Sequence, residues 1–521
     1  ILFSDSITDH MLGSRILLDQ LCQQLNVEVG QVRADQLVSV NTTSCTGMCD
    51  QGPALLVNGI AITNLDEPRI SLISQLVESG ADISEWSNEF FTVRNNIRRK
   101  DILLSCMHEE YDRQQALQQL VDPLPADILN ILQSSGLRGR GGAGFPTARK
   151  WRDCRDADAA RRYVICNADE GEPGTFKDRV LLQSYAHQLI EGMTLCGHAV
   201  NATHGLIYLR GEYRYLLDHL QAVIDERRTA GLLGNNILGK RNLDFDVDIH
   251  LGAGAYICGE ESALIESLEG KRGIPRKRPP FPCTYGYLGE PSVVNNVETF
   301  IAAAQIIIHG AQWFSSSGTE QSSGTKLLSI SGDCKQPGIY EYPFGTTVRQ
   351  ILQDCGATNV QAVQIAGAAG TTLPPDQFDR VIAFEDLGTG GSLIIFNQQR
   401  KLLDMVQNFA HFFVHESCGF CTPCRVGGSL LKDLVDKVHS GHGSCHDLDE
   451  MKRIAGIMRE TSFCGLGATA PSHVLQTLDS FSHVYVERLS QADYEPAFDL
   501  DAALAEARRL APHHCKSNTD S

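Results

Sequence analysis

The sequence predicts an α/β protein of several domains that ends in a helical region. The chain has 521 residues, and a chain of this length usually divides into three or four domains. Between residues 116 and 313, short apolar strands alternate with helical segments, which is typical of a parallel or mixed sheet. From residue 398 to about 490 the apolar spacing is helical.

Residues 1–85 are expected to form a first domain that mixes strands and helices. Residues 12–25 have helical apolar spacing, and residues 54–62 predict two strands joined by a turn at Asn58 and Gly59. Residues 86–115 are polar and charged, and we expect them to form a linker.

The second domain is expected over residues 116–314. A helix at residues 126–133 precedes a glycine-rich loop, and apolar strands are expected at residues 163–166, 206–209 and 245–250. Residues 315–325 are rich in Ser and Gly, which predicts a flexible boundary.

The remaining chain predicts two further domains and a tail. Residues 326–397 form a small α+β module in this interpretation, and residues 398–490 form the helical domain. Residues 491–521 are a tail, and the polar stretch after residue 512 is expected to be disordered. The elements expected in the α+β module are strands 326–330, 362–365 and 392–396 and a helix at residues 348–354.

Composition excludes several classes of protein. A net charge of −18 argues against nucleic-acid binding, which needs a basic surface. The richest apolar run, residues 301–308, is too short to span a bilayer. The sequence does not begin with Met and shows no basic signal segment, so we expect a cytoplasmic protein whose first residues precede Ile1. The 17 cysteines then indicate metal or redox ligation rather than disulfides.

The strongest motif is a cysteine triplet followed by a fourth cysteine. Cys418, Cys421 and Cys424 are spaced as C-x2-C-x2-C, and Cys464 follows in the same helical region. Three thiolates on one tight loop plus a distant fourth suit a [4Fe–4S] cluster. The main alternative is a structural zinc ion, which is usually held by two pairs of ligands.

A glycine-rich loop at residues 136–145 is the second motif. Gly139, Gly141 and Gly144 have GxGxxG spacing, but a helix rather than a strand precedes them, so this is not a Rossmann fingerprint. Its amides, with Arg140 and Lys150, could hold phosphates. The alternative is a plain glycine-rich turn.

Two further segments follow predicted strands. Asp169, Glu170 and Glu172 lie after the strand at 163–166, where carboxylates can meet a ligand, although a solvated acidic turn is the alternative. Residues 252–261 follow the strand at 245–250 and open a helix, which suits a phosphate. Two such loops indicate two nucleotides, a bound flavin and a diffusing dinucleotide. The amides of residues 295 and 296 and the hydroxyl of residue 299 could bond an isoalloxazine or ribityl group. A basic run could bind phosphate, but its pattern favours a surface or subunit-contact loop; it consists of Lys271, Arg272, Arg276, Lys277 and Arg278.

Together these motifs resemble the NADH-binding flavoprotein subunit family of respiratory complex I and its soluble relatives. The resemblance covers about residues 116–490 and implies a Rossmann-like FMN/NADH domain, a ubiquitin-like β-grasp domain of SLBB type and a four-helix bundle with a [4Fe–4S] cluster. The dinucleotide would bind around Phe145, Lys150 and Glu172, with Glu260 and Glu261 near its ribose. FMN would be held by Gly139, Arg140, Gly141, Gly142, Lys150, Asn167, Asp169, Glu170, Tyr256, Gly259, Glu260, Glu261, Asn295, Asn296 and Thr299. In the glycine loop, Ala148 stands where the family commonly has Gly.

Residues 1–85 resemble the thioredoxin-like [2Fe–2S] subunit of the same complexes. That family binds its cluster with a C-x4-C pair and a later C-x3-C pair. Cys45 and Cys49 match the second pair, but Ser4 and Asp9 occupy the positions of the first. Because these clusters strongly prefer thiolate, we expect the N-terminal cluster to be absent or atypically ligated.

Fusion of the two modules is typical of soluble complexes, and residues 331–340 and 464–469 are most similar to the diaphorase large subunit of NAD-reducing [NiFe]-hydrogenases. The resemblance implies hydride transfer between NAD(H) and FMN without a side chain acting as acid or base, with Glu172 orienting the nicotinamide. Single electrons would then pass through the [4Fe–4S] cluster to partner iron–sulfur and hydrogenase subunits. A molybdenum formate dehydrogenase or a complex I-type NADH dehydrogenase is the alternative, and a non-enzymatic zinc scaffold is the remaining one.

Overall fold

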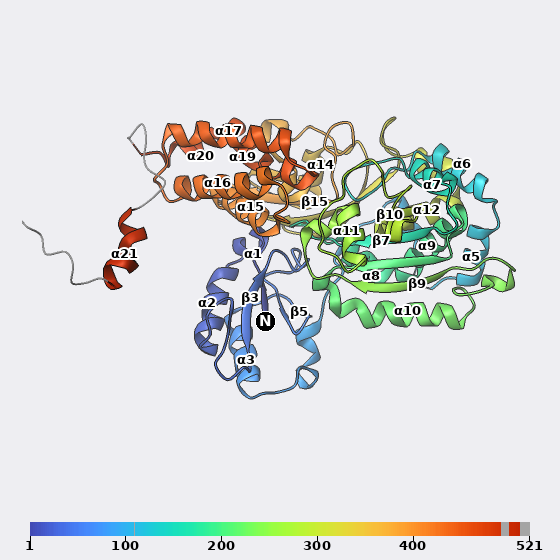
Figure 1. Cartoon of the computed structure of the whole chain (residues 1–521), viewed down its shortest axis with the longest axis horizontal. Coiled ribbons are helices and arrows are strands. Elements are labelled where there is room, and N and C mark those ends of the chain that lie inside the picture. Colours follow the sequence, from blue (N-terminus) through green and yellow to red (C-terminus); the bar gives the residue numbers. More distant parts are fainter. Residues whose placement is uncertain (109, 491–499, 511–521) are drawn as a thin grey trace, which may run out of the picture.

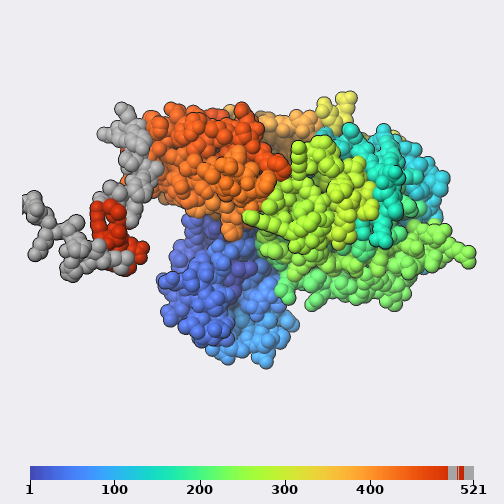
Figure 2. Space-filling view, viewed as in Figure 1, coloured from blue at the N-terminus to red at the C-terminus, as the bar shows by residue number. Residues whose placement is uncertain are grey.

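The computed structural model describes residues 1–108, 110–490 and 500–510. These residues form three sheets and a C-terminal group of helices (Figure 1). We refer to residues 1–85 as the N-terminal domain, 116–314 as the central domain, 326–397 as the third domain and 398–490 as the helical domain. In the space-filling view of Figure 2, the N-terminal domain lies against both the helical and the central domains.

The N-terminal domain is a five-stranded sheet with strand order β2-β3-β1-β4-β5. Strand β1 pairs in parallel with β3 and antiparallel with β4. The predicted turn is confirmed, because Asn58 and Gly59 both have positive φ, as a two-residue hairpin of this kind needs. The elements are β1 (Leu2–Ser4), α1 (Ile7–Met11), α2 (Ser14–Leu25), β2 (Gln31–Val32), β3 (Ser39–Thr43), β4 (Leu55–Val57), β5 (Ile60–Ile62) and α3 (Glu67–Glu78).

The segment predicted as a linker is structured. Residues 86–115 contain η2 (Asn88–Phe91), β6 (Ile97–Arg99), α4 (Ile102–Cys106) and the start of α5 (Arg113–Val121), and η1 (Ile83–Glu85) lies just before them. Strand β6 pairs in parallel with a strand of the third domain about 240 residues later in the chain. Three residues with no alternating pattern gave no sign of this long-range pairing.

The central domain is built on a parallel four-stranded sheet with strand order β10-β7-β8-β9. The sequence predicted a parallel or mixed sheet and three of these strands, whereas β10 was not expected. The carboxyl ends of its strands therefore meet at one edge, where ligands bind in open α/β sheets. The strands are β7 (Tyr163–Ala168), β8 (His204–Leu209), β9 (Asp246–Leu251) and β10 (Ser292–Asn296). The helices are α6 (Pro125–Ser135), α7 (Thr147–Asp156), α8 (Lys177–Ser184), α9 (Ala186–Val200), η3 (Gly211–Leu216), α10 (Leu217–Thr229), η4 (Ile237–Gly239), η5 (Tyr256–Gly259), α11 (Glu261–Leu268), η6 (Tyr287–Gly289), α12 (Val297–His309) and α13 (Ala311–Ser315).

The third domain has a six-stranded mixed sheet with strand order β14-β13-β15-β11-β12-β6. The three predicted strands and the predicted helix are present, whereas β12 and the short β14 were not expected. The elements are β11 (Thr325–Gly332), β12 (Gly338–Pro343), α14 (Val348–Asp354), β13 (Val360–Ile365), η7 (Gly367–Ala369), β14 (Thr371–Leu373), η8 (Pro375–Gln377) and β15 (Ser392–Asn397).

The Ser/Gly-rich stretch at residues 315–325 is packed rather than free, contrary to the flexible boundary that its composition predicted. Ser322 is fully buried and its hydroxyl donates to Glu385. The side chain of Arg138 donates to the carbonyl of Gln321, and that of Arg140 donates to the carbonyl of Ser323. These side chains arrive from a distant part of the sequence, so local composition could not reveal them.

The helical domain follows as predicted. It contains α15 (Leu402–Glu416), α16 (Thr422–His439), α17 (Cys445–Thr461), α18 (Gly465–Thr469), α19 (Ser472–Ser480) and α20 (Ser482–Val486). A further helix, α21 (Leu500–Leu510), lies in the segment expected as a tail, while the disorder predicted after residue 512 falls outside the described residues. In the described part of the chain, every helix is too short or too polar to cross a membrane.

One apolar core joins all four domains, with Ile7 as the contribution of the N-terminal domain. It includes Ile257 and Leu264 of the central domain, Ile394 of the third domain and Phe409 and Val435 of the helical domain. Because these side chains pack together, the edge of the central sheet, the third domain and the helical domain are held against one another. The functional site lies at this junction.

Candidate cofactor cavity and cysteine cluster

A cavity of about 700 Å³ lies at the carboxyl edge of the central sheet, between the central, third and helical domains. Its volume is in the range of cofactor-binding cavities. Ten of the residues predicted to bind FMN or the dinucleotide line it. They are Gly141, Gly142, Asn167, Asp169, Glu170, Glu172, Tyr256, Gly259, Glu260 and Asn296.

Seven other predicted residues do not line this cavity: Gly139, Arg140, Phe145, Lys150, Glu261, Asn295 and Thr299. Arg140 is fully buried, with its guanidinium 4.8 Å from the centre of the Phe344 ring. Its backbone amide donates to Thr299 Oγ1 at 2.9 Å. Asn295 accepts from the indole of Trp151 at 3.0 Å. These residues fix the shape of the glycine loop rather than presenting charge to the cavity.

Lys150 and Phe145 also face elsewhere. The Lys150 ammonium is 2.9 Å from Glu261 and 3.0 Å from the carbonyl of Val294. Phe145 is 43% exposed and lies under the guanidinium of Arg149. A dinucleotide that reached Phe145 would therefore have to extend beyond the cavity over the surface of α7.

The glycine loop connects α6 to α7, so a helix precedes it as predicted. Gly144 has φ +63°, and a Cβ added there would lie 2.5 Å from the ring of Phe384. A Cβ at Gly141 would lie 3.4 Å from Asn296. At Gly144 the positive φ and the close approach of Phe384 therefore exclude a larger residue, whereas at Gly141 a Cβ would make an ordinary van der Waals contact.

The acidic segment places two different carboxylates at the cavity. Burial raises the pKa of Asp169 to about 8, and its Oδ2 has no hydrogen-bond partner among the described residues. Glu172 accepts from the Tyr256 hydroxyl at 2.5 Å, and burial raises the pKa of Glu172 to about 7. An unpartnered buried oxygen is costly unless a ligand donates to it. Asp169 therefore fits the donor groups of a bound cofactor.

Glu170 has a structural task instead. Its carboxylate accepts from the backbone amides of Asp178 at 2.8 Å and Arg179 at 3.0 Å, and from the Tyr213 hydroxyl at 2.8 Å. These bonds cap the start of α8, which turns the next side chains toward the cavity. Burial raises the pKa of Glu170 to about 7.

Lys177 was missed by the sequence reasoning. It is buried, and its ammonium is 2.6 Å from Asp178, 3.1 Å from Glu298 and 3.1 Å from the Asn296 side-chain oxygen. Although burial opposes the charge, the carboxylates of Asp178 and Glu298 hold the pKa of Lys177 above its usual value. Lys177 is thus a fixed cation of the cavity. Its place a few residues after the acidic residues 169–172 is the sequence feature that could have identified it.

Glu416, at the end of α15, was also missed. Its carboxylate accepts from the Tyr256 amide at 2.9 Å and from the hydroxyl of Ser44. One residue therefore joins the helical, central and N-terminal domains beside the cavity.

The four predicted cluster cysteines converge. Cys418, Cys421, Cys424 and Cys464 line a second, small cavity, three from the loop that opens α16 and one at the start of α18. Among the described residues, no three His, Cys, Asp or Glu side chains stand close enough to share one metal ion. Four thiols around one small cavity supply the ligand set of a [4Fe–4S] cluster. Burial raises the pKa of Cys424 and Cys464, so their thiolates need a bound cation.

The two cavities share a wall. Ile257, in η5, and Leu466, in α18, line both the large cavity and the cysteine cavity. A group bound in the large cavity would therefore be separated from the cysteines by little more than two aliphatic side chains.

The predicted N-terminal site differs from a four-thiolate site. The Cys45 and Cys49 sulfurs are 3.4 Å apart and buried, close enough to bind one iron. Asp9, however, accepts from Ser4 at 2.5 Å, from Ser6 at 2.6 Å and from the Ala54 amide at 3.1 Å. Its carboxylate already accepts three hydrogen bonds within the protein, and Ser4 offers only a hydroxyl. Two of the four positions therefore lack a thiolate, and the residues present do not fit a [2Fe–2S] cluster of the usual kind.

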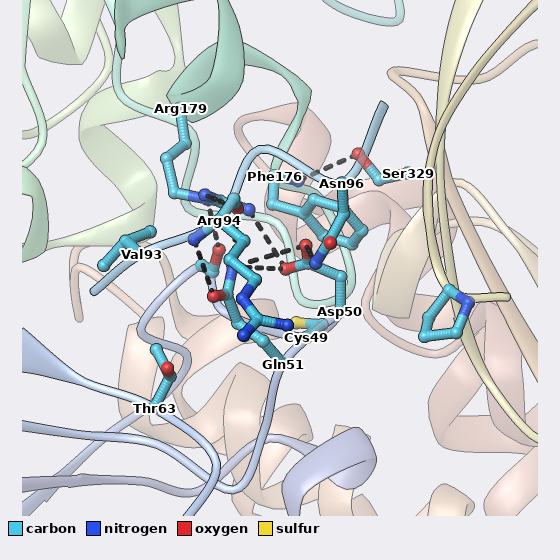
Figure 3. Close-up of polar contacts among 12 residues, drawn as sticks. Cys49, Asp50, Gln51, Thr63, Val93, Arg94, Asn96, Phe176, Arg179 and Ser329 are labelled. Atoms are coloured by element: carbon cyan, nitrogen blue, oxygen red, sulfur yellow. Dashed lines mark hydrogen bonds and ion pairs between the residues drawn. The ribbon is translucent and has the colours of Figure 1, made fainter. Parts of the chain in front are cut away.

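The loop that carries Cys45 and Cys49 is bound to the central domain by two buried arginines. Arg179 forms an ion pair with Asp50 at 3.0 Å and donates to the carbonyls of Gly47 and Arg94 (Figure 3). Arg210 donates to the carbonyls of Glu170 and Cys45. Because Arg179 is in the first turn of α8, the N-terminal domain and the cavity wall share one rigid element.

Three family models match the chain. The Nuo51 FMN-binding domain matches residues 132–305, the NADH-ubiquinone oxidoreductase-F iron–sulfur binding region matches residues 404–488, and the thioredoxin-like [2Fe-2S] ferredoxin matches residues 1–77.

Individual relatives extend the similarity to nearly the whole chain. The NAD-reducing hydrogenase HoxS subunit alpha of Cupriavidus necator is 42% identical over 514 residues, which cover 96% of this chain and 85% of the relative. An NADH-quinone oxidoreductase subunit of Mycobacterium tuberculosis is 40% identical over 393 residues, covering 73% of this chain and 88% of the relative. A crystal structure of an NAD+-reducing [NiFe]-hydrogenase in the H2-reduced state matches with a TM-score of 0.94 and 43% identity, covering 99% of this chain and 88% of that chain.

The two neighbouring cavities and these matches define an oxidoreductase that uses NAD(H), FMN and iron–sulfur clusters. The chain belongs to the NADH-binding flavoprotein subunit family of complex I and of NAD-reducing hydrogenases, as its motifs predicted.

Proposed function

We propose that the chain is the diaphorase subunit of a cytoplasmic NAD-reducing hydrogenase, in which H2 + NAD+ is interconverted with NADH + H+. The observation that carries this proposal is the wall of Ile257 and Leu466 shared by the cofactor cavity and the cysteine cavity. Such a wall allows electrons to move between the two sites over a short path. The similarity to the hydrogenase relative across 96% of this chain supports the choice of partner.

The domain assignments follow from the same proposal. Residues 116–314 would be the Rossmann-like FMN- and NAD(H)-binding domain, 326–397 the β-grasp domain and 398–490 a four-helix bundle. Residues 1–85 would be the thioredoxin-like domain, joined by the segment 86–115, and 491–521 would follow as a tail.

Asp169 and Lys177 are the side chains best placed to hold FMN. Asp169 offers an unpartnered buried oxygen to a donor of the cofactor, and Lys177 supplies the fixed cation of the cavity. The backbone at Gly141 and Gly142 lets the cofactor approach closely. When bound, FMN would supply hydride acceptance from NADH and the cluster would supply one-electron transfer.

Glu172 and Tyr256 would position the nicotinamide. The Tyr256 hydroxyl holds the Glu172 carboxylate at 2.5 Å. A Cβ at Gly367 would lie 2.2 Å from Glu172, so the third domain confines this side chain as well. The pair is therefore rigid at the mouth of the cofactor site, as an orienting group must be.

Cys418, Cys421, Cys424 and Cys464 would hold the [4Fe–4S] cluster through which electrons leave. The rings of Phe420 and Phe463 line the cysteine cavity, and they are 53% and 42% exposed. The cluster would therefore lie just beneath the surface, where an iron–sulfur subunit of the partner could receive electrons.

The partner can be tested directly by purifying a tagged chain with its associated subunits under anaerobic conditions. The proposal predicts reduction of NAD+ with H2 by the isolated complex. Reduction of NAD+ with formate but not with H2 would instead show a formate dehydrogenase, and NADH oxidation with quinone alone would show a complex I-type enzyme.

A further inference from the structure

Two arginines from different domains bind the backbone of the cysteine loop. Arg272 belongs to the loop after α11 in the central domain, and its Nη2 donates to the carbonyl of Cys418 at 2.6 Å. Arg425 lies in the first turn of α16, and its Nη1 donates to the carbonyl of Gly419 at 2.7 Å. The sequence pattern alone assigned the basic run around Arg272 to a surface or subunit contact.

Neither charge is neutralised by a neighbouring carboxylate. Within the described residues, no Asp or Glu lies within ion-pair distance of Arg272 or Arg425. Three other bases of the run differ: Lys271 pairs with Glu269 at 2.7 Å, and Arg276 and Arg278 pair with glutamates of the central domain. Arg272 is the member of the run whose side chain reaches the cysteine loop.

We propose that Arg272 and Arg425 raise the reduction potential of the cluster held by Cys418, Cys421, Cys424 and Cys464. This inference rests on the proposed ligand set. Reduction adds one negative charge to the cluster, and net charge and hydrogen bonding around such clusters set their potentials. Two cations that bind the backbone of the ligand loop, and that have no carboxylate partner among the described residues, stabilise the reduced form more than the oxidised form.

Both arginines are exposed, which limits the size of the effect. Solvent and salt screen exposed charges, so each arginine should change the ratio of reduced to oxidised cluster by at most about tenfold, which is 59 mV for one electron. The shift should also become smaller at high salt. A purely structural role would show no such salt dependence.

The test is a redox titration of the full chain, loaded with FMN and cluster, in which the EPR signal of the reduced cluster is followed at fixed pH. Arg272→Gln and Arg425→Gln should each move the midpoint to more negative potential. Each shift should correspond to at most about a tenfold change in the ratio of reduced to oxidised cluster. Arg272→Lys keeps the charge, so its midpoint should lie closer to that of the wild type than to that of Arg272→Gln. Lys271→Gln is the matched control and should leave the midpoint unchanged, because its ammonium already pairs with Glu269.

The outcomes separate this inference from the proposed function. A wild-type chain without iron or EPR signal would overturn the proposed cluster itself. If the cluster is intact and both glutamine variants have the same midpoint as Lys271→Gln, only the inference about the arginines is overturned. The same holds if the midpoint of Arg272→Lys shifts as far as that of Arg272→Gln. If Arg272→Gln fails to assemble the cluster, the midpoint of Arg425→Gln tests the inference instead. Arg425 and the carbonyl it binds both belong to the helical domain, so this substitution leaves the contact between the two domains in place.

Discussion

The ion pair between Arg179 and Asp50 gives a sharp test of how the N-terminal domain is attached. Both side chains are 0% exposed, and the pair spans the boundary between the N-terminal and central domains. Asp50→Ala would leave the Arg179 guanidinium buried, with only the carbonyls of Gly47 and Arg94 as partners. Removing one member of a buried pair costs about 3–5 kcal/mol, because the remaining charge is uncompensated. We expect a loss of that size in the opening free energy of the loop at residues 45–50.

Hydrogen exchange followed by mass spectrometry measures this quantity on the full chain, since a multidomain protein need not unfold in one step. The matched control is Asp379→Ala, which breaks a pair with Arg349 whose side chains are 47% and 73% exposed. Exposed pairs are worth about 0–1 kcal/mol, so the control should change local opening little. An Asp50→Ala loss no larger than that of the control would refute the view that this pair anchors the domain.

Three other predictions concern the cofactor sites. Glu172→Ala should raise KM for NADH by about tenfold or more while FMN stays bound, because an orienting contact is lost. Steady-state kinetics measure KM and flavin absorbance measures bound FMN. A parallel loss of FMN would show that Glu172 holds the flavin. Because burial raises the pKa of Asp169 to about 8, this carboxyl keeps an extra proton in the folded apoprotein between about pH 4 and 8. Its own contribution to stability should fall as pH rises, by at most about 1.4 kcal/mol per pH unit, and Glu170 and Glu172, with pKa values raised to about 7, should add to the slope. Asp169→Asn should flatten that slope in thermal unfolding at pH 6 and 8, and an unchanged slope would assign it to another group. Iron analysis of the purified chain should give about four iron atoms per chain, and about six would mean that the Ser4 and Asp9 site holds a second cluster.

Local patterns predicted most of the fold. Three strands of the central sheet, the helix before the glycine loop and the hairpin at Asn58 and Gly59 each depend on neighbouring residues, and all were predicted and are present. Strand β6 was missed because its partner β12 is about 240 residues away. The packing of residues 315–325 was missed for the same reason, because their partners Arg138, Arg140 and Glu385 lie far away in the sequence.

The candidate site was predicted less completely, because sequence identifies a loop but not the direction of its side chains. Arg140 looked like a phosphate ligand, yet its guanidinium stacks on Phe344. Lys177 supplies the cavity's cation instead, oriented by the bonds that Glu170 makes to the start of α8. Helical-domain residues such as Gln476 line the cavity only through tertiary packing. The four cysteines were predictable because their spacing itself defines the chemistry.

We propose that electrons reach the cysteine site from the flavin cavity and leave from there. The most direct measurement adds NADH anaerobically to the FMN-loaded complex and follows flavin absorbance, the EPR signal of the cluster and electron delivery to the partner subunits. Cys424→Ala should keep the NADH-dependent flavin change but lose the cluster signal and delivery to the partner, while Cys445→Ala, at an exposed cysteine outside the set, should behave like the wild type. Undiminished electron delivery to the partner subunits by Cys424→Ala would show that electrons do not leave through this cluster.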